Sequence, residues 1–456
     1  DVAIHARRRR DLCTQLGGGL VLLPGNDEAP INYTDNVYPF RQDSSFLYYI
    51  GLAQPGLAAL IDCDTGETTL FGDDVPVEQI VWTGPLPTMG ERAAWVGVEK
   101  MAARAKLAEA VAAALAAGRT VHFPPAYRGE TREQLRALGL RPEAPSVDLI
   151  RAIVAQRQYK QPEEIAEIEA AIEVSRVMHE LAMRQVRPGR IEREVVAEAK
   201  ALAHARGMRT AFPTIFSVRG EILHNTTSHR RMEAGQLVVH DSGVETARGY
   251  CSDITRTIPV AQRFEGVQRD IYAIVLEAQL AAIAMMRPGV EFREVHRRAG
   301  ERLVEGLKAL GIVRGDVQEA VAADVHTLFF QCGLGHMMGL DVHDMEGLGE
   351  EYVGYSESVR RNPAFGWSSL RMARALEPGH VMTVEPGIYF IPELIDQRRA
   401  QKWREEFVDY AVLEKFVGFG GVRIEDDVLV TDDGHRVLGP PIPKTMDDVE
   451  EIAGRR

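Results

Sequence analysis

LVVHDSGVETARGYCSDITRTIPV (Leu237–Val260) joins strand-forming residues to two aspartates, Asp241 and Asp253. Its apolar and β-branched residues predict two strands connected by a turn. Asp is depleted in strands, and a buried carboxylate needs a partner or a metal ion. If the turn centres near Ala247, the two aspartates face each other with Cβ atoms about 5 Å apart. Such carboxylates repel each other, so we expect a cation between them; the alternative is two aspartates in exposed turns.

The composition is that of a folded, acidic protein. The chain has 456 residues, is 45% hydrophobic, and carries a net charge of −13 from 53 basic and 66 acidic side chains. Its length predicts two or more domains. An acidic chain without a basic block is a poor nucleic-acid binder. No apolar run approaches the roughly 18 residues of a membrane span, so we expect neither nucleic acid nor membrane as a partner.

The cysteines indicate the cellular compartment. There are four, without a CxxC pair: Cys13, Cys63, Cys251 and Cys332. Scattered cysteines are typical of a reducing compartment and argue against a disulfide framework or a thiolate zinc site. We therefore expect a cytoplasmic protein. No signal peptide is visible. Because the chain begins at Asp1 without Met, removal of an N-terminal segment is an open alternative.

The first third of the chain predicts a mixed αβ domain. LGGGLVLLPG (16–25) and RTVHFPP (119–125) are typical of strands, and AALIDCDTGETTLFG (58–72) is typical of a hairpin. MAARAKLAEAVAAALAAG (101–118) predicts an Ala-rich helix that ends at its glycine. A polar segment and Pro162 at a helix start indicate a boundary near Lys160. We expect an N-terminal domain over 1–159 and a second domain over 160–456.

The second domain contains a weak internal repeat. RPGRIEREVV begins at Arg187 and RPGVEFREVH begins at Arg287, 100 residues later, each between two predicted helices. This pattern indicates a duplicated half-domain with a site between the halves. The alternative is that Pro-Gly simply ends two unrelated helices.

Three later segments carry the remaining ionisable candidates. CGLGHMMGLDVHDMEG supplies His336 and His343, and LEPGHVMTVEPGIYF places Glu385 at the end of an apolar strand. In GFGGVRIEDDVLVTDDG, Arg423 and Glu425 lie two apart and share a strand face. Four carboxylates and one imidazole form an oxygen-rich set that suits Mn²⁺ or a similar ion. Two ions about 3.5–4 Å apart, bridged by carboxylates, are a hydrolytic arrangement. Other histidines are expected to be ordinary core or surface residues: His240, His326 and His380.

Four segments, taken in their order along the chain, resemble motifs of the pita-bread metallopeptidases: HDSG…GYCSDITRT, GLGHMMGLDVHD, TVEPGIYF and GGVRIEDDVLVTDDG. That family includes Xaa-Pro dipeptidase (prolidase), aminopeptidase P, methionine aminopeptidase and creatinase. VYPFRQDSSFLYYIG (37–51) resembles the N-terminal domain of prolidase and aminopeptidase P. The resemblance implies an α/β two-domain fold, with a creatinase-like N-terminal αβ domain and a C-terminal pita-bread catalytic domain.

The resemblance also implies a dinuclear metal site with two divalent ions, Mn²⁺ or alternatively Co²⁺ or Zn²⁺. Its five implied ligands are Asp241, Asp253, His336, Glu385 and Glu425. Asp253 and Glu425 would bridge the ions, Asp241 would bind one ion, and His336 and Glu385 would bind the other. The two aspartates are 12 residues apart, where the family usually has 11.

Three further residues match substrate contacts of the family: His224, His343 and Arg371. Arg423 matches an arginine behind the metal site that orients the carboxylates. Two departures fall near the expected substrate pocket. Cys332 stands where the family often has a histidine, and Phe212 lies in a segment that is shorter than usual.

Among the members, SLRMARALEPG and the insertion between Tyr389 and Gly420 favour prolidase, with aminopeptidase P as the alternative. The implied reaction is hydrolysis of the Xaa-Pro bond in small peptides with proline at the second position, by a homodimer. Glu385 would move a proton, and His343 would stabilise the oxyanion. Arg371 and His224 would hold the terminal carboxylate of the substrate. A pita-bread binding protein without catalysis is a third possibility, which the complete ligand set disfavours.

Overall fold

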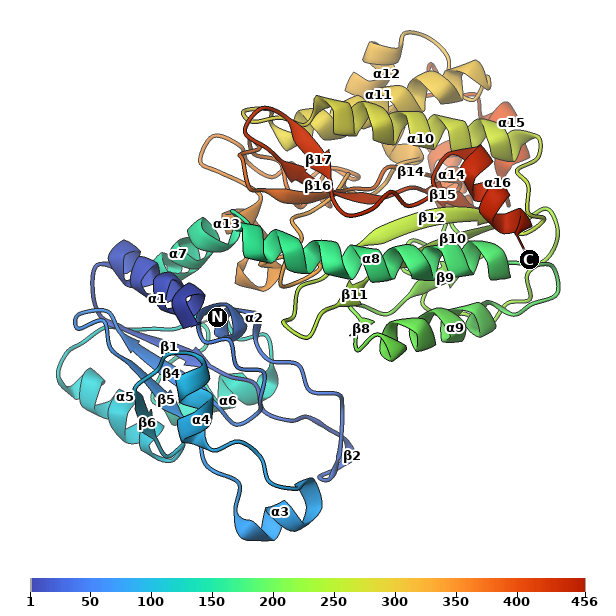
Figure 1. Ribbon diagram of the computed structural model, residues 1–456. Coiled ribbons are helices and arrows are strands. Elements are labelled where there is room, and N and C mark those ends of the chain that lie inside the picture. Colours follow the sequence, from blue (N-terminus) through green and yellow to red (C-terminus); the bar gives the residue numbers. More distant parts are fainter. Residues whose placement is uncertain (1, 456) are drawn as a thin grey trace. The chain divides into compact units, whose positions relative to one another are not determined.

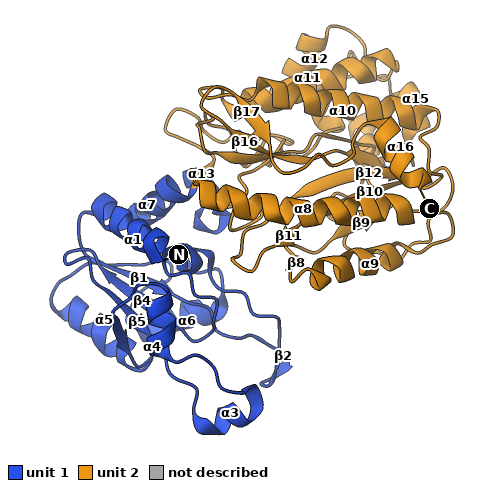
Figure 2. Cartoon of the chain, viewed as in Figure 1, with its two compact units in different colours: residues 1–157, 345–352 blue, residues 158–344, 353–456 orange. Residues whose placement is uncertain are grey.

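The computed structural model describes residues 2–455, which divide into two compact units. Unit 1 extends to Arg157 and also includes Met345–Tyr352 (Figure 2). Unit 2 comprises Gln158–Asp344 and the chain from Val353 onward. The division at Arg157 lies close to the boundary expected before Lys160. No pattern in the sequence predicts that the eight residues Met345–Tyr352 belong to unit 1.

Unit 1 contains a mixed five-stranded sheet with the order β6-β5-β4-β1-β7. The pairs β1–β4 and β4–β5 are antiparallel, and β5–β6 and β1–β7 are parallel. The core packs apolar strand residues such as Leu22 and Leu60 against Val111 of helix α5. The strands of the sheet are β1 (Leu20–Pro24), β4 (Ala58–Asp62), β5 (Thr68–Phe71), β6 (Lys100–Ala102) and β7 (Val121–His122).

The remaining elements of unit 1 are short helices and one hairpin. The helix expected over 101–118 begins only at Lys106, because Met101 belongs to β6 and pairs with Leu70. The elements are α1 (Val2–Leu16), α2 (Ser44–Tyr49), α3 (Val77–Thr83), α4 (Met89–Trp95), α5 (Lys106–Ala116), α6 (Gly129–Ala137), α7 (Val147–Arg157), η2 (Glu346–Leu348) and the hairpin β2 (Pro30–Tyr33)–β3 (Asn36–Val37); α13 (Glu350–Val353) follows η2.

Unit 1 also contains a disulfide bond between Cys13 and Cys63, which are 50 residues apart in the sequence. The expectation of scattered, reduced cysteines is therefore wrong for this pair. Spacing alone could not reveal the contact, because it depends on the end of α1 meeting the end of β4. The other two cysteines, Cys251 and Cys332, are not part of a disulfide bond. Within residues 2–455, none of the helices is long and apolar enough to cross a membrane.

Unit 2 is built from several small antiparallel sheets (Figure 1). The strand orders are β12-β10-β9, β11-β8, β13-β16-β17 and β14-β15. Their bounds are β8 (Arg209–Thr210), β9 (Ile215–Ser217), β10 (Leu237–Ser242), β11 (Val244–Glu245), β12 (Ile254–Pro259), β13 (Val381–Val384), β14 (Gly387–Tyr389), β15 (Gly421–Arg423), β16 (Asp426–Val430) and β17 (His435–Val437). An isolated bridge between Thr255 and Glu425 joins β12 to the segment between β15 and β16.

Two helix pairs flank these strands. The pairs α8 (Pro162–Gln185) with α9 (Glu192–Ala205) and α10 (Val267–Met285) with α11 (Phe292–Ala309) follow the expected repeat. In each pair the Pro-Gly glycine has a positive φ, +90° at Gly189 and +84° at Gly289, which glycine adopts without strain. In Figure 1 strands β10, β12 and β16 lie between α10 and α8. The other helices are α12 (Val317–Ala322), η1 (Val325–Leu328), α14 (Pro392–Ala400), α15 (Tyr410–Leu413), η3 (Glu414–Phe416) and α16 (Met446–Gly454).

The register of β10 and β12 differs from the expected hairpin. Asp241 pairs with Thr255, not with Asp253, which lies just before β12. The strand is interrupted at Gly243, where an added Cβ would lie 1.6 Å from the carbonyl oxygen of Ser252, and β11 then pairs with β8. The register is thereby shifted by two residues. Because side chains alternate with period two, an even shift keeps both aspartates on one face as diagonal neighbours.

Candidate metal centre

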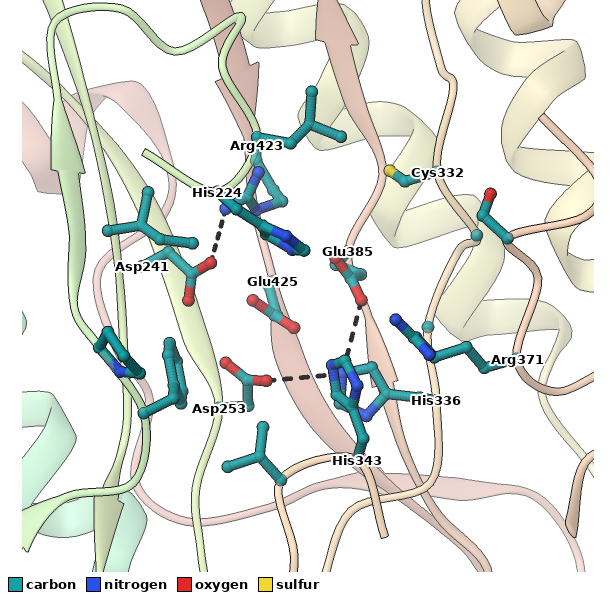
Figure 3. A pocket seen from close by; sticks show the side chains of 18 of the residues that line it. His224, Asp241, Asp253, Cys332, His336, His343, Arg371, Glu385, Arg423 and Glu425 are labelled. Carbon is teal, nitrogen blue, oxygen red and sulfur yellow. Dashed lines mark hydrogen bonds and ion pairs between the residues drawn. The ribbon is translucent and has the colours of Figure 1, made fainter. Parts of the chain in front are cut away.

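A cavity of about 680 Å³ in unit 2 contains the predicted site. Apolar side chains such as Phe212, Ile215, Leu223 and Val342 form part of its wall. Figure 3 shows the ionisable side chains converging on this cavity from several elements. All nine residues proposed from the sequence line it: His224, Asp241, Asp253, His336, His343, Arg371, Glu385, Arg423 and Glu425.

Strand ends position the four carboxylates. Asp241 is the fifth residue of β10, and Asp253 immediately precedes β12. Glu385 follows the last residue of β13, and Glu425 lies between β15 and β16. The strands next to these carboxylates consist largely of buried residues, so the packing of the sheets fixes where each strand ends. Side chains at those ends can then project into the cavity while the backbone stays hydrogen-bonded.

Three of these residues form a tight cluster. One ligand atom each from Asp253, His336 and Glu425 lies within 4.8 Å of the others, and all three residues are buried. The His336 Nε2 atom is 3.5 Å from Asp253 Oδ2 and 3.7 Å from Glu385 Oε1. Asp241 lies on the other side of Glu425 in Figure 3, held by Arg423.

The loop around His336 sets the orientation of its ring. The backbone N–H of His336 donates to Thr383 Oγ1 at 3.1 Å, and the ring Nδ1 lies 3.0 Å from the carbonyl oxygen of Met337. A protonated Nδ1 donates to that carbonyl and leaves Nε2 with its lone pair toward the carboxylates. Metal-binding histidines commonly have this arrangement, in which a backbone acceptor fixes the tautomer. Burial lowers the pKa of His336 to about 4, which also favours the neutral ring.

The carboxylates are packed more closely than their charges allow without a cation. Burial raises the pKa of Asp253 well above its usual range, and repulsion from Glu425 and Asp241 raises it further. Burial likewise raises the pKa of Glu425 well above its usual range, and the pKa of Glu385 to about 8. Low dielectric and like charges therefore oppose ionisation of the cluster. A bound divalent cation would reverse that preference.

The donor set fits such a cation. Among the described residues, the buried Oδ1 atoms of Asp241 and Asp253 accept no hydrogen bond from the protein. Buried carboxylate oxygens are normally satisfied, so these two atoms indicate a partner other than a side chain. Several carboxylates with one imidazole are the ligands that Mn²⁺ and similar ions accept. The site can therefore hold divalent metal ions through its own side chains.

Arg423 occupies the predicted position behind the carboxylates. Its Nη2 donates to Asp241 Oδ2 at 2.6 Å, its Nη1 donates to Tyr389 Oη at 3.1 Å, and its Nε donates to Thr255 Oγ1 at 3.1 Å. The guanidinium thus fixes Asp241 by a charge-assisted bond.

Two residues beside the cluster were not expected from the sequence, Thr255 and Asp427. Thr255 lies two residues after Asp253, and that i, i+2 spacing on a strand is a signal that could have found it. Asp427 accepts the backbone N–H of Asp253 at 3.1 Å, and burial raises its pKa well above the usual range. Its position follows from packing between β12 and β16, which no local pattern encodes.

The two departures from the family pattern also lie in the cavity wall. Cys332 and Phe212 both line it, and burial raises the pKa of the Cys332 thiol to about 12. The thiol is therefore neutral at physiological pH. A neutral thiol and a phenyl ring change the shape and polarity of the wall but leave the carboxylate cluster intact.

The histidines expected to be ordinary core residues are buried and do not line this cavity: His240, His326 and His380. The placement is confirmed, but their hydrogen bonding is incomplete. Neither ring nitrogen of His326 has a partner in the described structure, nor does Nδ1 of His240 or Nε2 of His380.

Comparison with known proteins agrees with this geometry. Residues 166–432 match the model of metallopeptidase family M24, and residues 5–122 match the aminopeptidase P, N-terminal domain. Xaa-Pro dipeptidase of Homo sapiens is 32% identical, covering 98% of this chain and 93% of that protein. Xaa-Pro aminopeptidase of Escherichia coli (strain K12) is 31% identical, covering 98% and 96%. The solved structure of Zn-substituted E. coli aminopeptidase P in complex with product has a TM-score of 0.81 and 29% identity, covering 99% and 98%.

These matches confirm the predicted architecture of an N-terminal αβ domain and a C-terminal pita-bread domain. The M24 match extends over more than half of the sequence and contains the whole proposed ligand set. The metal cluster, the fold and the relatives agree: the chain is a metallopeptidase and belongs to family M24.

Proposed function

We propose that this chain hydrolyses the Xaa-Pro bond of dipeptides, with two divalent metal ions as cofactors and Mn²⁺ as the native ion. One observation carries the proposal: the carboxylate cluster shares a single cavity with Arg371, His224 and His343. A dipeptide presents a scissile carbonyl and a free carboxylate only one residue apart. A compact cavity that combines a metal cluster with cationic or hydrogen-bonding groups suits such a substrate.

The charge of the cluster supports two ions. Asp241, Asp253, Glu385 and Glu425 contribute four negative charges when ionised, and Arg423 contributes one positive charge. Three negative charges remain in a buried site, which is costly without further cations. Two divalent ions together with one hydroxide neutralise that remainder. When bound, such ions supply a hydroxide nucleophile near neutral pH and polarise the scissile carbonyl.

The chain's own residues supply binding and proton transfer. We assign Arg371 and His224 to the terminal carboxylate, and His343 to a hydrogen bond with the oxyanion that develops on the carbonyl oxygen. Glu385 would receive the proton of the attacking water and deliver it to the proline nitrogen as that bond breaks.

Aminopeptidase P activity on longer peptides is the second candidate. It is supported by the similarity to solved aminopeptidase P structures and by the match of residues 5–122. We favour the dipeptidase because Arg371 lies 14 residues before Glu385, in a segment that resembles prolidase. A non-catalytic role has no support, because none of the implied metal ligands has been replaced.

Substrate length and metal dependence test the proposal together. Metal-stripped protein is reloaded with Mn²⁺, Co²⁺ or Zn²⁺, and kcat/KM is measured for Ala-Pro and for Ala-Pro-Ala. We expect activity only after reloading, highest with Mn²⁺, and a clear preference for the dipeptide. Equal or faster cleavage of the tripeptide would identify an aminopeptidase instead. Full activity with a strong chelator present would exclude a metal mechanism.

Variants of the cluster test the assigned ligands. Asp253→Ala and Glu425→Ala each remove an oxygen from the tight cluster, so hydrolysis should be abolished while the circular dichroism spectrum is preserved. Asp447→Ala, which removes an exposed carboxylate from α16, is the matched control and should retain full activity. Retention of activity by both cluster variants would show that the ligands have been misassigned.

Three further properties are part of the proposal. We propose domains over 1–159 and 160–456. We also propose a homodimer; a light-scattering mass near the 50.5 kDa of one chain would contradict the dimer. A cytoplasmic location is kept as a proposal, although the disulfide between Cys13 and Cys63 is more typical of an oxidising compartment.

A further inference from the structure

Thr255 is in hydrogen-bond contact with the carboxylate cluster without being one of its ionisable groups. It is on β12, opposite Asp241 on β10, and its side chain is completely buried. Its side chain shares a strand face with that of Asp253, two residues earlier. The hydroxyl group lies against one proposed metal ligand, Glu425.

The hydroxyl connects two carboxylates through one arginine. Thr255 Oγ1 donates to Glu425 Oε2 at 2.7 Å and accepts from Arg423 Nε at 3.1 Å. The same guanidinium donates through Nη2 to Asp241 Oδ2 at 2.6 Å. Asp241 and Glu425, which come from segments 184 residues apart in the sequence, are thus held by one continuous set of hydrogen bonds.

The direction of these hydrogen bonds is fixed by chemistry. A guanidinium has only donors, so the bond from Arg423 must use a lone pair of the Thr255 oxygen. A hydroxyl has a single proton, which is then available for Glu425 Oε2. That carboxylate oxygen is held as an acceptor, which favours the ionised form that a metal ligand requires. The other oxygen of Glu425 stays free to face a cation.

We propose that Thr255 is a positioning residue that orients Glu425, and through Arg423 also Asp241, for metal binding. This inference rests on the proposed metal-dependent function. Hydrogen-bond partners of metal ligands typically change metal affinity by about 10–100-fold when they are removed. The backbone does not depend on the side chain, because the N–H of Glu425 donates to the Thr255 carbonyl oxygen at 3.1 Å.

The same strand offers a matched control. Thr257 is also completely buried, and its hydroxyl donates to the carbonyl oxygen of Arg423 at 2.9 Å and accepts from the N–H of Arg423 at 3.1 Å. It therefore makes the same number of hydrogen bonds as Thr255, but to backbone atoms and not to a carboxylate. A purely structural role of buried threonines on β12 predicts equal effects at both positions.

The experiment measures Mn²⁺ binding to metal-free protein by isothermal titration calorimetry. We expect Thr255→Val, which is isosteric and lacks the hydroxyl, to bind Mn²⁺ about 10–100-fold more weakly than the wild type. Thr255→Ser should recover binding to within about threefold, because it keeps the hydroxyl. Thr257→Val should bind Mn²⁺ like the wild type even if its melting temperature falls.

Two results would overturn the inference. One is wild-type Mn²⁺ affinity in Thr255→Val; the other is an equal loss of affinity in Thr257→Val. Thr255→Ala is measured in parallel with the same expectation, so the comparison holds if the valine variant does not fold. The calorimetric readout is also independent of substrate. A wild type that binds Mn²⁺ but cleaves no Xaa-Pro dipeptide would refute the proposed function and leave this comparison intact.

Discussion

Lys160 Nζ lies 2.8 Å from Asp344 Oδ2, and both side chains are only 1% exposed. Asp344 directly follows His343, and its N–H donates to the carbonyl oxygen of Met337. The N–H of Lys160 donates to the carbonyl oxygen of Gly379, just before β13. The ion pair therefore fastens the start of the α8 segment to the loop that carries His336 and His343. A buried pair of this kind is expensive to break from one side only.

Lys160→Met should therefore destabilise the protein strongly. It leaves the Asp344 carboxylate buried without its cation, at a cost of about 3–5 kcal/mol in the free energy of unfolding. Urea denaturation measures this cost. The double variant Lys160→Met/Asp344→Leu removes both charges and should recover a large part of the stability, since well-packed apolar pairs often replace buried ion pairs. Wild-type stability of the single variant would show that the pair is not desolvated in solution.

Arg371→Ala should impair dipeptide cleavage far more than tripeptide cleavage. A guanidinium that holds the terminal carboxylate in a desolvated cavity contributes about 2–5 kcal/mol, or some tens to thousands of fold in kcat/KM. In Ala-Pro-Ala the carboxylate lies one residue further away, so the same substitution should matter less. Both substrates are assayed with the wild type and the variant.

The matched control for Arg371 is Arg360→Ala, which removes an exposed arginine from the neighbouring segment. Exposed charges of this kind contribute about 0–1 kcal/mol, so its kcat/KM values should stay close to those of the wild type. Equal losses for the dipeptide and the tripeptide in Arg371→Ala would assign this arginine to the fold of the loop and not to the terminal carboxylate.

Acid should destabilise unit 2 through His296 and His326. The two buried rings are 5.9 Å apart between centroids, and in the described structure neither nitrogen of either ring has a hydrogen-bond partner. Burial lowers the pKa of His296 to about 3 and that of His326 to about 4, against 6.5 for an exposed histidine. Asp324 acts in the opposite direction on His326 without cancelling the effect of burial.

The direction in which the free energy of unfolding changes with pH follows from proton binding. Between pH 6.5 and about 4 the unfolded chain binds protons that the folded chain excludes, so stability is lost as pH falls through this window. The loss is on the order of 3 kcal/mol per histidine. His296→Phe should make the profile of unfolding free energy less steep between pH 7 and 4.5. His204→Ala, at an exposed position on α9, should leave its slope unchanged. A wild-type stability that is constant over this range would contradict the prediction.

Local patterns in the sequence selected residues that line one cavity in the structure, because each carries its own signal. A carboxylate in an apolar strand, as at Asp241, is improbable without a cation, and the order of motifs around Glu425 is specific to one family. The register of β10 and β12 was not predictable, because it depends on the break at Gly243 and on β11 pairing elsewhere. Thr255 has only one signal, its i, i+2 spacing from Asp253, because an uncharged residue in a strand is not unusual by itself.

Contacts between distant segments were also hidden from the sequence. Lys160 and Asp344 are 184 residues apart, and each alone resembles an ordinary surface charge. Their pairing depends on the packing of the segment just before α8 against the loop between η1 and η2, which no periodic pattern specifies. The link between Cys13 and Cys63 has the same origin, since the cysteine count and spacing favoured free thiols.

The disulfide between Cys13 and Cys63 gives a direct chemical prediction. Protein purified without reductant and then denatured should react with a thiol reagent at only two cysteines per chain, Cys251 and Cys332. The bond closes a loop with a sequence separation of 50 residues, which in the chain-entropy model contributes about 4 kcal/mol to stability. Reductant should therefore lower the melting temperature of the wild type and leave that of Cys13→Ser/Cys63→Ser unchanged. Four reactive thiols before reduction would refute the bond and favour the reducing compartment that the sequence suggested.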